Sequence, residues 1–144
     1  MSRRLPPPDA TRRIHAQRPS HDCGVAALAG YLGSTYEDAY VAAAATSEAF
    51  LRRQGLTIAD MITMAREFGR TLVRTHYRKV DLDEHVGILG VNWRKSDWKR
   101  HGATGHWVIL RAGTIIDPVG PSYGDAADYL AVNHGRVGTL LREA

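Results

Sequence analysis

The chain has 144 residues, of which 44% are hydrophobic and 24% charged, and its formal net charge is +4. This length and composition fit one globular domain and exclude an intrinsically disordered chain. The single cysteine excludes an internal disulfide and a cysteine-based zinc cluster. Because there is no signal peptide, and no apolar run approaches the roughly 18 residues that span a bilayer, we expect a cytoplasmic protein with no membrane partner.

Positive charge is concentrated near the amino terminus, but aromatic residues do not alternate with it. A nucleic-acid-binding surface needs a basic stripe with stacking side chains, or a known module, and neither is visible. We therefore expect no nucleic-acid partner. Residues 1–13 contain three consecutive prolines and paired arginines, a composition typical of a flexible basic arm. Residues 14–144 are expected to form a single domain.

The first half of the chain predicts helices, over residues 22–32, 36–45 and 57–69. In the first of these, Asp22 is a suitable N-cap for a run of small and apolar residues, and Gly33 suits the carboxyl end. In the third, Thr57 and Asp60 have the spacing of a capping box, and apolar residues recur at helical intervals.

The second half changes to the pattern of β-strands, rich in β-branched and aromatic residues. The predicted strands are residues 71–77, 86–93, 106–110, 114–117 and 137–141. A polar loop is predicted over residues 96–105, and a short helix over residues 125–132. Helices followed by strands indicate an α+β fold, in which a helical part packs against an antiparallel sheet.

Cys23 lies in the first turn of the first predicted helix. The helix dipole and the unpaired N–H groups of that turn stabilise a thiolate, which is the nucleophilic form of cysteine. Gln17, six residues upstream, offers an amide donor. A lone cysteine is more commonly a small buried hydrophobic residue. A catalytic role therefore also requires a base within reach of the sulfur.

His106 begins one predicted strand, and Asp117 ends the next. A two-residue turn at residues 112–113 places Val108 opposite Asp117. Because side chains alternate along a strand, His106 and Asp117 then share one face and lie diagonally across the pair. We expect an imidazole–carboxylate contact, which would orient His106 as the base for a cysteine nucleophile. Taken singly, a buried structural histidine and a turn aspartate are the more common explanations of these residues.

Together these segments resemble the bacteriocin-processing peptidases of family C39, which are papain-like cysteine peptidases. The resemblance covers residues 14–121 and rests on Gln17 with Asp22-Cys23-Gly24, on Gly55-Leu56-Thr57, on Gly105–Leu110 and on Ile116-Asp117-Pro118. The best-known members are domains of peptide-exporting ABC transporters. No ATP-binding or transmembrane region accompanies the motifs here, so we expect a stand-alone domain.

The resemblance implies a papain-like fold in which the helical part carries Cys23 and the sheet carries His106 and Asp117. Cys23 would be the nucleophile, and His106 the general base and then the general acid. Asp117 would orient His106. The side-chain amide of Gln17 and the backbone N–H of Cys23 would form the oxyanion hole.

The resemblance also implies a peptide or protein substrate, cleaved after small residues such as Gly-Gly, and no metal or cofactor. Such a substrate suits a narrow cleft, and we expect Gly105 and Trp107 to bind it, with residues 94–105 as a wall. The remaining histidines lack the spacing of metal ligands. Two alternatives stay open: deamidation or peptide ligation by the same residues, and an inactive papain-like binding or inhibitory module.

Overall fold

The computed structural model of the chain describes residues 22–52, 54–101, 103–118 and 122–144. The described part opens with four helices: α1 (Cys23–Leu32), α2 (Tyr36–Thr46), α3 (Glu48–Leu51) and α4 (Ile58–Glu67). The strands are β1 (Leu72–His76), β2 (Val86–Trp93), β3 (Gly105–Arg111), β4 (Thr114–Asp117), β5 (Ser122–Asp125) and β6 (Gly135–Glu143). The connections contain η2 (Tyr77–Lys79), η3 (Lys95–Asp97), α5 (Trp98–His101) and α6 (Ala126–Asn133).

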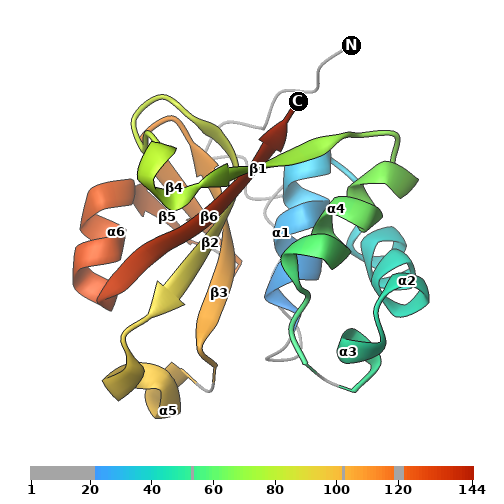
Figure 1. The fold of residues 1–144 in the computed structure, drawn as a ribbon, viewed down its shortest axis with the longest axis horizontal. Coiled ribbons are helices and arrows are strands. Elements are labelled where there is room, and N and C mark those ends of the chain that lie inside the picture. Colours follow the sequence, from blue (N-terminus) through green and yellow to red (C-terminus); the bar gives the residue numbers. More distant parts are fainter. Residues whose placement is uncertain (1–21, 53, 102, 119–121) are drawn as a thin grey trace.

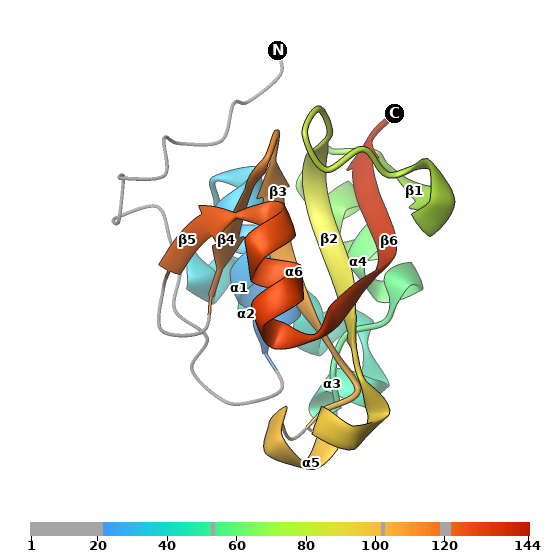
Figure 2. The ribbon, with the colours of Figure 1, turned by 90° about the vertical axis from the view of Figure 1, so that its left-hand side faces the viewer.

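The strands form one antiparallel sheet in the order β1-β6-β2-β3-β4-β5. The layer of α1, α2 and α4 lies on one side of this sheet, and α6 lies on the other (Figures 1 and 2). The predicted α+β fold, with amino-terminal helices packed on a carboxyl-terminal antiparallel sheet, is therefore confirmed. In the described parts of the chain, no helix has the length and apolar character to pass through a membrane.

Local sequence explains where α1 ends and where α4 begins. Small and apolar residues make α1 buried along its whole length, and Gly33 ends it with a left-handed φ of 72°, which glycine adopts without strain. The predicted capping box at the start of α4 is present: Thr57 accepts from the backbone N–H of Asp60, and Asp60 accepts from that of Thr57. Local sequence therefore fixes the end of α1 and the start of α4.

The β3–β4 hairpin has the predicted two-residue turn. Ala112 and Gly113 both have positive φ, 37° and 89°, as expected of a turn that matches the twist of the strands. The pairs that follow include Ile109 with Ile116, which is the register expected from the sequence. This register fixes where the side chains at the end of β4 lie relative to the start of β3.

Two hydrophobic clusters hold the layers together. The helix-side cluster joins α1, α2 and α4 to one face of the sheet through residues that include Leu28, Met61, Ile109 and Leu141. The α6-side cluster is smaller and joins α6 to the other face through residues that include Leu89, Val108, Leu110 and Leu140. Alternation along β3 thus sends Trp107 and Ile109 to the helices, and Val108 and Leu110 to α6.

Some predicted elements differ from the structure. The predicted loop over residues 96–105 is wrong in part, because it contains α5 and the end of η3. The last strand is longer than expected, since it pairs with both β1 and β2. Two further elements, α3 and β5, were not predicted, and both are only four residues long. The predicted flexible arm, residues 1–13, lies outside the described residues.

Candidate active site

Helix α1 brings Cys23 to the junction between the helices and the sheet. Cys23 is the first residue of α1, and its exposed fraction is 8%. Backbone N–H groups in the first turn of a helix have no acceptor within the helix. The sulfur-bearing residue therefore lies among polarised N–H groups, as the sequence predicts, and is otherwise packed among apolar side chains.

Asp22 stands at the N-cap position, but its side chain makes no capping hydrogen bond, so this part of the prediction is wrong. The carboxylate is fully buried and accepts a hydrogen bond from the hydroxyl of Tyr36 in α2. This contact spans fourteen residues of sequence and ties the start of α1 to the next helix. The hydrogen bond from Tyr36 thus anchors Asp22, the residue that precedes Cys23.

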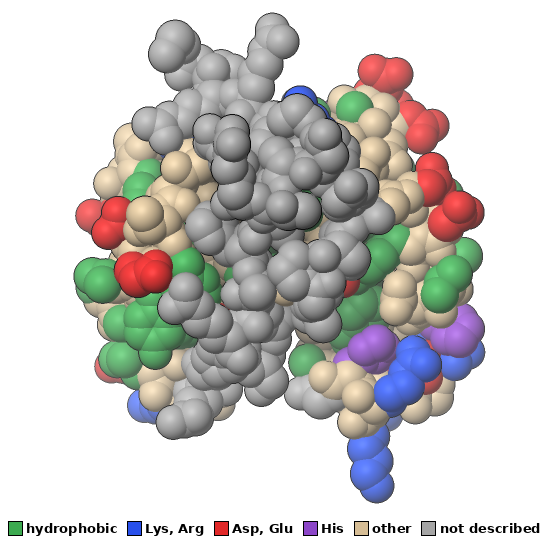
Figure 3. All heavy atoms as spheres, turned by 180° about the vertical axis from the view of Figure 1, so that it is seen from behind, with side chains coloured by type: hydrophobic (Ala, Val, Ile, Leu, Met, Phe, Trp, Pro, Cys, Tyr) green, Lys and Arg blue, Asp and Glu red, His purple; other side chains and the backbone are tan. Residues whose placement is uncertain are grey.

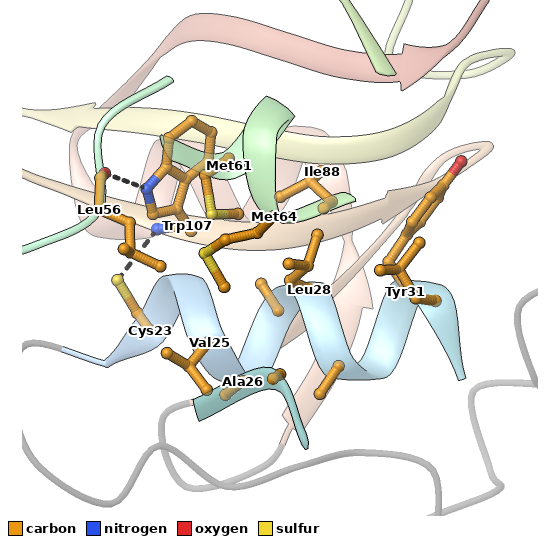
Figure 4. Packing of buried hydrophobic residues seen from close by; sticks show 14 of the residues in the cluster. Cys23, Val25, Ala26, Leu28, Tyr31, Leu56, Met61, Met64, Ile88 and Trp107 are labelled. Carbon is orange, nitrogen blue, oxygen red and sulfur yellow. Dashed lines mark hydrogen bonds between the residues drawn. The ribbon is translucent and has the colours of Figure 1, made fainter. Parts of the chain in front are cut away.

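The backbone of β3 contacts the sulfur directly. The N–H of Trp107 donates to Sγ of Cys23 at 3.5 Å, and the indole N–H of the same residue donates to the carbonyl of Leu56 at 3.0 Å. Figure 4 shows both bonds, with Cys23 facing the start of β3. Among the described residues, the pairing of β3 with β4 begins at Ile109 and Ile116, so the N–H of Trp107 lies outside that ladder and can donate to the sulfur.

The predicted pair of His106 and Asp117 is present. Nε2 of His106 and Oδ1 of Asp117 are 2.8 Å apart, and their side chains are only 9% and 12% exposed. Both residues belong to the face of the sheet that α6 covers, as alternation along the two strands requires. The hairpin register therefore brings the imidazole and the carboxylate together.

The surroundings of His106 favour its charged form. Burial lowers the pKa of His106, but hydrogen bonds with Asp117 and Cys23, and the negative charges of these two groups, outweigh burial and raise the pKa to about 10. Since Nε2 faces Asp117, Nδ1 is the ring nitrogen left for the sulfur. The arrangement is that of a thiol, an imidazole and an orienting carboxylate in series.

Tyr129, in α6, completes the series and was not predicted from the sequence. Its hydroxyl donates to Oδ2 of Asp117 at 2.6 Å. Burial raises the pKa of Tyr129, and the carboxylate of Asp117 raises it further, so the phenol stays protonated and remains a donor. No sequence motif marks Tyr129, because its contact depends on how α6 packs against the sheet.

Aromatic rings stack beside the imidazole. The ring centroids of Trp93 and His106 are 5.8 Å apart, and those of Trp93 and His101 are 4.1 Å apart. Burial, and then the charge of Arg100, lower the pKa of His101, which favours its neutral form. His101 had no predicted role, and the structure places it one ring away from His106.

The segment of η3 and α5 gathers basic side chains at one edge of the molecule. Figure 3 shows Lys, Arg and His side chains clustered at the lower right, where this segment lies. Asp97 holds the segment together, with oxygens 3.2 Å from Arg94, 3.8 Å from Arg100 and 3.2 Å from His134. The segment therefore has a defined position beside the site.

A cleft of about 960 Å³ opens at these residues. Its lining includes the three predicted catalytic residues of the described chain, both predicted substrate-binding residues and part of α5: Cys23, His106, Asp117, Gly105, Trp107, Arg100 and His101. Trp107 is nevertheless 8% exposed and packs mainly in the helix-side cluster. The cleft lies between Gly55-Leu56 on the helical side and Gly90 on the sheet.

Gln17, the predicted oxyanion-hole donor, lies outside the described residues. Within the described ranges, no three His, Cys, Asp or Glu side chains gather closely enough to hold a metal ion. No protein-family model and no curated protein matches this chain. The function of this chain is therefore inferred from the geometry of the site and from the resemblance in its motifs.

Proposed function

We propose that this chain is a papain-like cysteine peptidase, similar to family C39, that hydrolyses a peptide or isopeptide bond through a thioester. One observation carries the proposal. His106 is bonded to Asp117 through Nε2 and also interacts with Cys23, at the mouth of a cleft that all three residues line. An α+β arrangement with the cysteine on a helix and the histidine on a strand supports the papain-like assignment.

Each residue then has a step in the reaction. The sulfur of Cys23 attacks the carbonyl carbon of the scissile bond, and a C–S bond forms. The C–N bond breaks as His106 gives its proton to the leaving amine. Water next attacks the thioester while His106 accepts a proton from it, and cleavage of the C–S bond releases a carboxylic acid and restores the thiolate beside the protonated His106. Asp117 holds the imidazole in position throughout.

The negative oxygen of each tetrahedral intermediate needs hydrogen-bond donors. The backbone N–H of Cys23, in the first turn of α1, is one such donor, and we assign the side-chain amide of Gln17 as the other, as the resemblance implies. We assign cleavage after small residues such as Gly-Gly, as the resemblance implies.

The first test is alkylation of Cys23 by iodoacetamide as a function of pH. We expect rapid alkylation near pH 6.5 in the wild type, slow alkylation in His106→Ala, and none in Cys23→Ala, because only the thiolate reacts. Alkylation that is slow below pH 8 and unaffected by His106→Ala would contradict an ion pair and favour the inactive binding module.

The second test is digestion of a proteome-derived peptide library, read by mass spectrometry. We expect new peptide ends after small residues with the wild type and none with Cys23→Ala. Product mass also separates the related reactions, because hydrolysis cuts a peptide, deamidation replaces an amide without cutting, and ligation joins two peptides. Equal cleavage by Cys23→Ala would overturn the proposal.

A further inference from the structure

The charges in the cleft are unbalanced. Among the described residues that line it, Arg74 and Arg100 are basic, and Asp117 is the acidic one. Asp117 is bonded to His106 and Tyr129, and Arg100 has Asp97 at 3.8 Å. Arg74 forms no ion pair within the described parts of the chain. Its guanidinium is therefore a cation in the same cleft as Cys23, with no acidic partner among the residues that the structure describes.

The position of Arg74 follows from the sheet. Leu72 in β1 belongs to the helix-side cluster, and side chains alternate along a strand, so Arg74 projects from the same face. Arg74 pairs with Leu141 in β6, which also belongs to that cluster. The guanidinium thus lies on the side of the sheet that faces the helices and the cleft.

Small and short polar residues line the cleft between β3 and Arg74. They are Gly90 and Asn92 on β2 and Gly138 and Thr139 on β6. Large side chains at these places would fill the path across the sheet. The indole of Trp107 already lies against Gly90, so the path from the start of β3 to β1 runs past Asn92 and Gly138, where a segment of extended peptide has room to follow it.

We propose that Arg74 recognises an acidic side chain of the substrate, about five residues from the scissile bond. The order β1-β6-β2-β3 puts three strand spacings, about 14 Å, between Arg74 and the strand of His106. Through Leu141 and Ile88, the register places Arg74 level with Ile109, three residues or about 10 Å along β3 from His106. The two displacements combine to about 17 Å, which an extended peptide covers in about five residues. An arginine fork binds a carboxylate through two parallel hydrogen bonds. This inference rests on the proposed peptidase function.

The experiment compares peptide-library cleavage by the wild type, Arg74→Glu and Arg142→Glu. We expect Asp and Glu to be enriched at one position about five residues from the cut in wild-type products, and Lys and Arg to replace them with Arg74→Glu. In the best peptide, Glu→Gln at that position should lower kcat/KM about fivefold, as for a partly exposed ion pair. Arg142→Glu changes charge equally but projects from the opposite face, so it should keep the wild-type preference.

A binding measurement separates this inference from the proposed function. Immobilised Cys23→Ala protein is incubated with the same library, and the retained peptides are sequenced. Acidic peptides should be enriched, and this enrichment should disappear in Cys23→Ala/Arg74→Glu. Cleavage or binding without an acidic preference, or with one that survives Arg74→Glu, overturns the role of Arg74 and leaves the peptidase proposal intact. Acid-selective binding with no Cys23-dependent cleavage would overturn the peptidase proposal and leave the recognition of acidic side chains by Arg74 intact.

Discussion

The two faces of the sheet hold the two halves of the candidate site in different ways. On the helix side, Cys23 belongs to a large apolar cluster and begins a helix that is buried throughout. On the α6 side, a smaller apolar cluster lies beside a chain of polar contacts from His106 through Asp117 to Tyr129. Packing positions the thiol, and hydrogen bonds position the imidazole.

This difference predicts two kinds of sensitivity. Changes of volume on the helix side should displace the sulfur, since a close-packed core transmits strain. Changes of charge or of hydrogen bonding on the α6 side should alter how the imidazole is protonated and oriented, with little loss of packing. The two sides meet at the start of β3, where Trp107 donates to Cys23 and the preceding residue carries the base.

The largest effect is expected from removing the base. His106→Gln keeps a polar side chain of similar size but cannot take or give a proton, so turnover should fall by about 10² to 10⁴. The measurement is kcat/KM on the best library peptide, together with alkylation of Cys23 at pH 6.5. His76→Gln, an exposed histidine on β1, is the matched control and should behave as the wild type. A loss of less than about tenfold in His106→Gln would contradict the proposal that His106 acts as the base for Cys23.

The pH dependence of stability should report the α6 side. The pKa of His106 is raised to about 10, above the value of about 6.5 expected in the unfolded chain. The stabilisation is therefore complete below pH 6.5 and is lost as pH rises through about 10. Urea unfolding of the wild type should show a loss of about 2 to 4 kcal/mol over this range. Asp117→Asn removes the carboxylate that raises the pKa of His106, so this variant should lose less stability over the same pH range. An equal loss of stability in Asp117→Asn would show that Asp117 is not the cause of the raised pKa.

A volume change tests the helix side. A Cβ at Gly24 would lie 2.9 Å from Leu56, 3.2 Å from Met61 and 3.2 Å from Trp107, whereas one at Gly55 would meet nothing within 4 Å. Overpacking costs about 1 to 3 kcal/mol, and alanine gains up to about 1 kcal/mol in a helix. Gly24→Ala should therefore lose about 1 kcal/mol in urea unfolding and slow the alkylation of Cys23. Gly55→Ala is the control, and equal behaviour of the two variants would show that packing does not place the sulfur.

Local rules were sufficient for much of the fold and for the core of the site. Capping at Thr57 and the two-residue turn at Ala112-Gly113 are decided by neighbours in sequence, and both were predicted. The turn fixes the register of β3 and β4, and the register brings His106 to Asp117. This contact was predictable because counting residues from a tight turn leaves no other freedom.

Contacts between distant elements were not predictable in this way. The hydrogen bond from Tyr129 to Asp117 depends on how α6 packs on the sheet. The hydrogen bond from Tyr36 to Asp22 depends on how α1 and α2 pack against each other. The capping propensity of Asp22 was overridden by this tertiary contact. The stack of His101 on Trp93 requires α5, a helix of four residues, which is too short to show a hydrophobic period.

The smallest effect should come from the end of the polar chain. Tyr129→Phe removes the hydroxyl that donates to Asp117 and keeps the ring, so the carboxylate stays but is held less firmly. We expect kcat/KM to fall about threefold to tenfold, as for the loss of one ordinary hydrogen bond, because Tyr129 acts only through Asp117, with KM unchanged. Because Tyr129 would act through Asp117, an NMR titration of His106 should also change, whereas Tyr40→Phe, on the far helical layer, should alter neither measurement. If Tyr129→Phe lowers the unfolding midpoint but leaves the His106 titration unchanged, its hydroxyl contributes only to folding, and the functional chain ends at Asp117.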